Sequence, residues 1–234
     1  MHSAGRYVLD RIRVLYEKGE EVRYISHLDI LRVFDRAVRR AELPLAFSKG
    51  FNPHPLMTFA LPLPVGTTSE TEYADFEMET EIPADIFMSS LNQNLPEGIR
   101  VQKAEYVHEG KSLMASVRAA LYRIEIEYPE NAHFHDLAEG VKNLLDQENI
   151  FVQKKGEAQA KAADIKPQIH GCEIEAAGDR ILVMKILLDA GSRSNLRPEL
   201  VVEELEGFLG MEFEDYRIHR IGLYKEDRGD LFRV

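Results

Sequence analysis

Four arginines recur along one predicted helix of this chain, on a single face. They are Arg32, Arg36, Arg39 and Arg40. Because each residue advances about 100° around a helix axis, the four lie within an arc of about 100°, opposite the apolar residues of the same segment. Like charges at i, i+4 repel one another, so the grouping requires an anionic partner or intramolecular carboxylates such as Asp35 and Glu42. Two interpretations stay open, a solvated basic face and an anion-binding face.

A loop of unusual composition follows this helix, running from Ser48 to Pro55. It combines a lysine, an aromatic ring, an amide and a histidine, which are Lys49, Phe51, Asn52 and His54. These groups can bind a phosphate, stack on a base and form hydrogen bonds to its edges, as readers of single-stranded RNA do. Two prolines stiffen the loop. We therefore expect the helix and the loop to form an anion- or RNA-binding surface.

The alternative for the loop is purely structural. Gly50 and the prolines would then only shape a connection, and Phe51 would fill the core, because phenylalanine is usually buried.

Two histidines flank this region, His27 and His54. Neutral imidazole can bind a metal or act as an acid and base near neutral pH. His27 follows a predicted N-cap, Ser26, so its alternative role is to occupy the first helical turn. We expect no catalytic residue, no metal and no cofactor in this chain.

A second candidate anion site lies in the segment Gly191–Pro198, before another predicted helix. Its polar groups are Arg193, Asn195 and Arg197. Free amides at a helix start, with two arginines beside them, suit a phosphate. The alternative is a simple Asn or Ser cap with Pro198 in the first turn. Basic loops in both halves of the chain favour a shared ligand.

Composition limits the classes of function. The chain has 234 residues, a formal net charge of −11 and 44% apolar residues, and no stretch approaches the roughly 18 apolar residues of a membrane helix. The N-terminus lacks an export signal, so we expect a cytoplasmic protein without a membrane partner. The negative charge opposes indiscriminate binding to nucleic acid. The acidic run Glu70–Glu81 is expected to form solvated faces.

The single cysteine, Cys172, excludes an internal disulfide and any site in this chain that needs several thiolates, such as an iron–sulfur cluster. His170 and Cys172 together are fewer groups than a closed metal site requires. We interpret Cys172 as structural or incidental.

Hydrophobic periodicity predicts the order βαββαβ in each half. In the first half, strands are expected at 11–16, 56–61, 73–78 and 99–107, with helices at 27–42 and 83–94. In the second half, strands are expected at 120–128, 150–153, 180–189 and 217–224, with helices at 134–147 and 196–209. The segment 154–178 is expected to be a long exposed hairpin or mobile loop. The fold class is therefore α+β, with two tandem ferredoxin-like domains at 1–110 and 111–234.

The stretch RYISHLDILRVFDRAVRRAELPLAFSKGFNPHPLMTFALPLPVG, residues 23–66, resembles the opening signature of the radical SAM-linked proteins. The motif SNLRPE at 194–199 is also similar to that family. Its members occur beside, or fused to, a radical SAM protein, which implies that this chain supplies a partner function. A radical SAM enzyme holds its cluster with three cysteines, and one cysteine cannot do so.

Three hypotheses follow. The leading one is a non-catalytic accessory protein that works with a radical SAM enzyme and presents an RNA substrate. The second, by fold-level analogy, is a metal-independent ribonuclease that uses His27 or His54. The third is an interaction protein whose basic helix meets an acidic surface on its partner.

Overall fold

The computed structural model describes residues 11–107, 112–152, 162–177 and 179–226. The described residues form five α-helices and antiparallel sheets, and they divide into two compact units. Unit 1 contains the described residues up to Val117 together with 225–226, and unit 2 contains those of Arg118–Tyr224. None of the helices in these ranges is long and apolar enough to cross a membrane.

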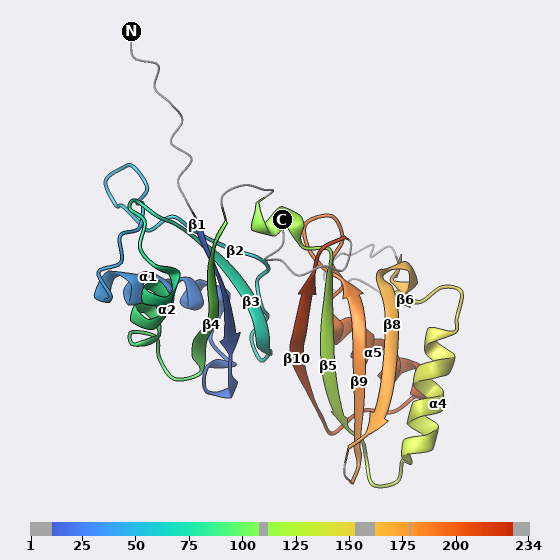
Figure 1. Cartoon of the computed structure of the whole chain (residues 1–234). Coiled ribbons are helices and arrows are strands. Elements are labelled where there is room, and N and C mark those ends of the chain that lie inside the picture. Colours follow the sequence, from blue (N-terminus) through green and yellow to red (C-terminus); the bar gives the residue numbers. More distant parts are fainter. Residues whose placement is uncertain (1–10, 108–111, 153–161, 178, 227–234) are drawn as a thin grey trace. The chain divides into compact units, whose positions relative to one another are not determined.

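Unit 1 has the element order βαββαβ, followed by one short helix (Figure 1). The elements are β1 (Arg11–Lys18), α1 (His27–Arg40), β2 (Met57–Phe59), β3 (Thr68–Glu77), α2 (Ala84–Asn92), β4 (Ile99–Val107) and α3 (Leu113–Ser116). The strands pair antiparallel in the order β4-β1-β3, and β2 also pairs with β3. The predicted strands and helices of this half are therefore all present.

The apolar residues that recur at strand and helix spacing in the sequence form the core of unit 1. Ile12, Val14 and Tyr16 of β1 point to one face of the sheet and are buried. Phe34 of α1 and Phe87 of α2 pack on that same face, so both helices cover it. The opposite side of α1 is left for the arginines.

The capping signal of α1 is confirmed. Ser26 is the N-cap, and its Oγ accepts a hydrogen bond from the Asp29 amide at 3.2 Å and donates one to the Asp29 carboxylate at 2.7 Å. The first bond satisfies the Asp29 amide at the helix start, and the second holds the Ser26 hydroxyl in place to accept it. Together they fix where α1 begins.

Unit 2 also carries a four-stranded antiparallel sheet, in the order β10-β5-β9-β8 (Figure 1). Its elements are β5 (Ala119–Glu127), α4 (Phe134–Leu145), β6 (Phe151–Val152), β7 (Ala163–Asp164), β8 (Ile169–Ala176), β9 (Ile181–Asp189), α5 (Pro198–Leu209) and β10 (Asp215–Tyr224). α4 packs against α5 and β9. Buried residues of β5 such as Ile124 and Ile126 complete this core.

The prediction for 154–178 is wrong in its second part. Residues Ile169–Ala176 form β8, which pairs antiparallel with β9. The strand expected at 150–153 does not join that sheet, because Phe151–Val152 pairs with Ala163–Asp164 in a separate two-stranded ribbon. Polar and apolar residues alternate along β8, as they do on the edge of a sheet. An exposed hairpin has the same alternation, so the sequence pattern does not distinguish the two. Residues 153–161 lie outside the described residues.

The prediction of solvated faces for the acidic run is also wrong in part. Asp75 of β3 is 2% exposed, and it forms a two-bonded ion pair with Arg13 of β1, with Nε–Oδ1 at 2.7 Å and Nη2–Oδ2 at 2.9 Å. Arg13 and Asp75 are register partners on adjacent strands, which places the two charges opposite each other. A cross-strand partner thus lets an acidic residue lie inside the fold.

Candidate functional site

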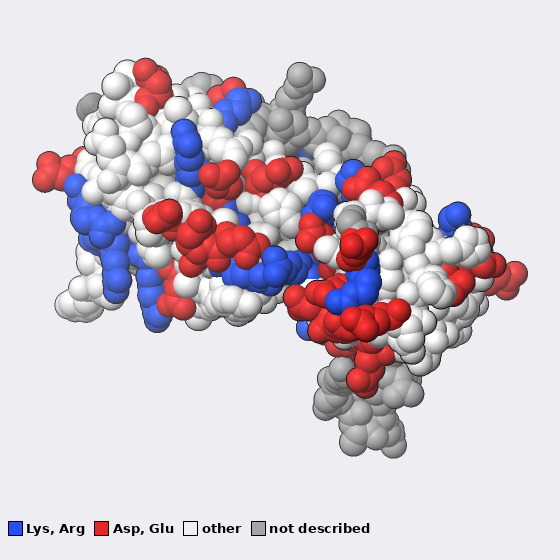
Figure 2. Space-filling model, turned by 90° about the horizontal axis from the view of Figure 1, so that it is seen from below, with Lys and Arg blue, Asp and Glu red and all other residues white. Residues whose placement is uncertain are grey.

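The four arginines of α1 are all exposed, as the helical period predicts. Figure 2 shows lysine and arginine side chains gathered over the side of unit 1 where α1 lies. The buried positions of the helix include Phe34, Ala37 and Val38, which face the core. The basic face and the apolar face of α1 are therefore separate.

Intramolecular carboxylates satisfy two of these arginines. Arg32 Nη1 lies 2.8 Å from Asp29 Oδ1, and Arg39 Nε lies 3.0 Å from Asp35 Oδ1. These are exposed pairs one helical turn apart, so each contributes only a few tenths of a kcal/mol, or about 0.3–0.5. The predicted role of Asp35 is confirmed.

Three further cations near them lack a carboxylate partner among the described residues. Arg40 donates to the backbone carbonyl of Asn94. In the described part of the chain, Arg36 and Lys49 make no hydrogen bond or ion pair, and both are exposed. The solvated-face interpretation therefore accounts for Arg32 and Arg39 but leaves Arg36 and Lys49 available to an anion.

The loop after α1 is a closed hairpin. Phe47 and Pro55 form an antiparallel bridge, and the Ser48 amide donates to the His54 carbonyl at 2.9 Å. Ser48 Oγ lies 2.8 Å from His54 Nδ1 and accepts from the His54 amide at 3.1 Å. His54 thus helps to close the loop. The tip, residues 49–53, extends beyond this closure.

Arg39 joins the loop to the helix. Its Nη2 donates to the Pro53 carbonyl at 2.9 Å, and its guanidinium carbon lies 5.0 Å from the ring centre of Phe47. The contact with Phe47 is a cation–π interaction. One arginine of the basic face therefore fixes the position of the loop against that face.

Phe51 at the tip of the loop is fully exposed, at 112% of its reference accessibility. The alternative that this ring fills the core is wrong. Gly50 before it has φ of +139°, a conformation that other residues rarely adopt. Lys49, Asn52 and His54 are exposed as well. We call the arginine face of α1 together with residues 48–55 the α1–loop surface.

The two histidines have separate surroundings. The ring of His27 packs edge-on against Phe59, with 5.8 Å between ring centres, and burial lowers the pKa of His27. His54 is bound to Ser48 in the loop. Among the described residues, no group of three or more histidine, cysteine or carboxylate side chains is arranged to hold a metal ion.

The segment Gly191–Pro198 lies in unit 2. Arg193, Asn195 and Arg197 are exposed, while the amide of buried Leu196 donates to the Asp189 carbonyl at 3.0 Å. The N-cap of α5 is Arg197, which makes no side-chain capping bond, so the expected Asn or Ser cap is wrong. Pro198 does occupy the first turn, as predicted.

A family model matches residues 11–198, and its description is "Uncharacterized protein conserved in bacteria (DUF2344)". The chain belongs to this family. No curated protein matches it.

Solved structures resemble this DUF2344 protein in fold. One is a chain of the crystal structure of a Cbf5-Nop10-Gar1 complex, with a TM-score of 0.54 at 9% identity over 94% of this chain and 51% of that chain. A second is a chain of the crystal structure of the archaeal box H/ACA sRNP Nop10-Cbf5 complex, with a TM-score of 0.48 at 9% identity over 94% and 50%. The DUF2344 protein thus spans about half the length of these chains.

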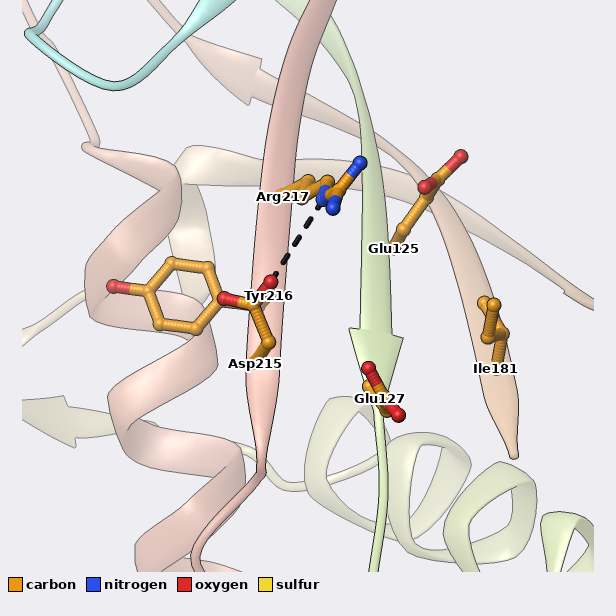
Figure 3. Close-up of a pocket in the computed structure, with 6 residues that line it drawn as sticks. All are labelled: Glu125, Glu127, Ile181, Asp215, Tyr216 and Arg217. Atoms are coloured by element: carbon orange, nitrogen blue, oxygen red, sulfur yellow. Dashed lines mark ion pairs between the residues drawn. The ribbon is translucent and has the colours of Figure 1, made fainter. Parts of the chain in front are cut away.

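The outer face of the unit 2 sheet has the opposite charge character. A pocket of about 170 Å³ lies there. Figure 3 shows the carboxylates of β5 and β10 among the residues that line it. Glu125, Glu127 and Asp215 lie around it with Arg217, whose Nε is 3.7 Å from Asp215 Oδ2. The alternation of Glu125 and Glu127 in the sequence is the signal for this face. Each of its carboxylates is paired with an arginine, Glu125 with Arg123, Glu127 with Arg180 and Asp215 with Arg217. A phosphate would therefore have to compete with these carboxylates for the arginines of this face.

Proposed function

We propose that this DUF2344 protein binds single-stranded RNA on the α1–loop surface of unit 1. The observation that carries the proposal is the fully exposed ring of Phe51, held at the tip of a loop that Arg39 attaches to the arginine face of α1. A large apolar ring exposed beside available cations is typical of a surface that stacks on bases and contacts phosphates.

Local charge explains how an acidic protein can do this. Arg36 and Lys49 are exposed without carboxylate partners, whereas the outer face of the unit 2 sheet is rich in glutamate. The main contact would therefore lie on unit 1, and binding would depend on salt, because each phosphate contact releases a counterion. Arg193, Asn195 and Arg197 in unit 2 belong to the proposal as a second, weaker contact.

The wider role is that of an accessory protein that presents this RNA to a radical SAM enzyme. Support comes from the resemblance of residues 23–66 to radical SAM-linked proteins and from the single cysteine, which leaves cluster chemistry to a partner. The likeness to the Cbf5-containing structure concerns the fold alone and does not support this role.

The same proposal includes the fold assignment of two tandem ferredoxin-like domains, at 1–110 and 111–234. Its support is the strand order, which is β4-β1-β3 with β2 on β3 in unit 1 and β10-β5-β9-β8 in unit 2. In each unit the first strand of the βαββαβ order lies between the fourth and the third, and the second strand pairs with the third. That arrangement is the expected one for a βαββαβ sheet with both helices on one face.

The ribonuclease hypothesis has weaker support. Burial lowers the pKa of His27, and its ring packs on Phe59, while His54 closes the loop through Ser48. Incubating structured RNA with the full chain in chelator tests it, and cleavage that is lost in His54→Ala would favour it over simple binding.

The deciding experiment measures the affinity of the full chain for a fluorescent single-stranded RNA dodecamer at several salt concentrations. We expect the logarithm of the association constant to fall with the logarithm of salt by about 0.7 for each phosphate contacted. Arg36→Ala with Lys49→Ala should reduce that slope and the affinity. The matched control is Arg217→Ala, an exposed arginine on the acidic face of unit 2, which should leave both unchanged.

Absent or salt-independent binding, or binding that the double variant leaves unchanged, would overturn the proposal. Copurification with a radical SAM protein, with and without nuclease, tests the wider role. Nuclease-resistant association would favour direct contact between α1 and an acidic protein surface.

A further inference from the structure

β8 is the edge strand of the unit 2 sheet. Among the described strands, β9 alone pairs with it, along one side. Alternate residues of an edge strand direct their amides and carbonyls outward, away from the sheet. Such an edge is a template for another strand unless something covers it.

A groove runs along this edge, between β8 and α4. It has a volume of about 400 Å³. Cys172 and Ile174 of β8 and Leu145 of α4 form its apolar lining, and Lys142 and Asp146 line it from α4 and the turn beyond. Lys166 and His170 also line the groove, so its lining is mixed and only part of it is apolar. A free strand edge beside a helix, with a partly apolar groove between them, is the geometry in which some domains bind an extended peptide as an added strand.

Hydrogen bonds join the two sides of the groove near one end. Lys166 Nζ donates to the Leu145 carbonyl at the end of α4. Asp164 Oδ1 accepts from the amides of Ile150 and Lys166, at 2.9 and 3.0 Å. These contacts tie the chain before β8 to the end of α4, so a ligand need not organise the groove itself.

The two glutamates of β8, Glu173 and Glu175, favour a ligand with basic side chains. Glu173 and Glu175 alternate with Cys172 and Ile174, so they lie on the opposite face of the sheet from the groove. Both are exposed, and Glu175 is 3.6 Å from Lys185 of β9. An incoming strand would place its own side chains beside these glutamates, where lysine or arginine is favourable and a carboxylate is not.

We propose that an extended segment of a partner protein adds to β8 as an antiparallel strand, with aliphatic side chains in the groove and basic side chains beside Glu173 and Glu175. A second copy of this chain is a poor occupant, because pairing two β8 strands would bring their glutamates together. This site is separate from the α1–loop surface and does not depend on RNA binding.

The test uses a capped octapeptide of alternating valine and lysine, added to the full chain and followed by fluorescence and by amide hydrogen exchange. We expect saturable binding that slows exchange of β8 amides. A peptide of alternating valine and glutamate should not bind. A valine–lysine peptide with alternate backbone amides methylated keeps its charge but loses donors, so it should bind at least about tenfold more weakly.

Matched variants separate pairing from general attraction to an acidic protein. Glu173→Lys with Glu175→Lys should weaken the lysine peptide about tenfold and allow the glutamate peptide to bind. If that variant unfolds, Glu173→Gln with Glu175→Gln should give a smaller loss in the same direction. Glu79→Lys with Glu81→Lys changes the net charge equally in unit 1, where both residues are exposed, and should leave the affinity within about twofold.

Four outcomes would overturn the proposal. They are no binding at millimolar peptide, equal binding of the methylated peptide, an equal loss in the unit 1 control, and β8 amides that are already protected at high protein concentration by self-association.

Discussion

Arg39 of α1 donates a hydrogen bond from Nη2 to the Pro53 carbonyl across 2.9 Å, and its guanidinium stacks over Phe47 with 5.0 Å between the guanidinium carbon and the ring centre. Phe47 precedes the loop and Pro53 lies near its far end. One side chain therefore restrains both arms of the loop, which lowers the entropy that the tip would lose on binding a ligand.

Replacing Arg39 tests this restraint. Arg39→Ala should speed amide exchange of residues 49–53 and weaken RNA binding about tenfold, because both a charge and the loop contacts are lost. Arg32→Ala is the matched control, since Arg32 pairs with Asp29 and, within the described part of the chain, has no hydrogen bond or ion pair to the loop. Equal effects of the two substitutions on exchange in the loop would show that Arg39 does not hold it.

Replacing Phe51 gives a sharper test, because the substitution should affect RNA binding without affecting folding. Phe51→Ala should weaken RNA binding by about 1–3 kcal/mol, the contribution of one stacked base. The melting temperature should stay unchanged, because the ring is fully exposed. Phe151→Ala, at a residue of unit 2 that is 58% exposed, controls for the general loss of an exposed ring. A fall in melting temperature with unchanged affinity would contradict the assignment.

The elements around the α1–loop surface were predictable because their signals are local. The Ser26 cap, the arginine face of α1 and the order of elements in unit 1 all follow from periods and capping chemistry within a few residues. The exposure of Phe51 was not predictable, since phenylalanine in a loop is compatible with burial and with display. The decisive contact, Arg39 with Pro53, joins residues 14 apart in the sequence.

Pairing between residues far apart in the sequence explains why the predictions for residues 154–178 and for the acidic run Glu70–Glu81 are partly wrong. Polar and apolar residues alternate over the short segment Ile169–Ala176, a pattern that also suits an exposed hairpin. Its pairing with β9 is what makes it a strand of the unit 2 sheet. Asp75 lies in an acidic run that suggests a solvated face, and only Arg13, 62 residues away, makes its burial possible. Neither partner is visible in a local window of sequence.

Breaking the buried ion pair between Arg13 and Asp75 should lower the free energy of unfolding by a large amount. Asp75→Ala removes the carboxylate that forms two hydrogen bonds with Arg13, at a site where both side chains are at most 3% exposed, so we expect a loss of about 3–5 kcal/mol in denaturant unfolding. Glu214→Ala removes one partner of Arg180 in an exposed pair and should cost under about 1 kcal/mol. Similar losses for the two variants would mean that water reaches Asp75.

His27 predicts a pH dependence of stability. Burial lowers the pKa of His27 in the folded state, so the unfolded state binds the proton more tightly. Stability should therefore fall as the pH drops below the unfolded pKa of about 6.5 and level off below the folded pKa. His27→Phe should flatten the free energy of unfolding between pH 7 and pH 5, whereas His135→Phe, at an exposed position, should not. An unchanged slope in His27→Phe would contradict the burial effect.

Cys172 should be an unreactive thiol. Burial, and then the charge of Glu173, raise the pKa of Cys172 to about 11. Because the thiolate is the reactive form, alkylation by iodoacetamide should be slow in the folded protein at pH 8 and should rise with a midpoint near that pKa, while the unfolded chain should show a midpoint near 8.5. Glu173→Gln should shift the folded midpoint downward by less than unfolding does, since burial is the larger cause. A folded midpoint close to that of the unfolded chain would contradict the expectation of an unreactive, buried thiol at Cys172.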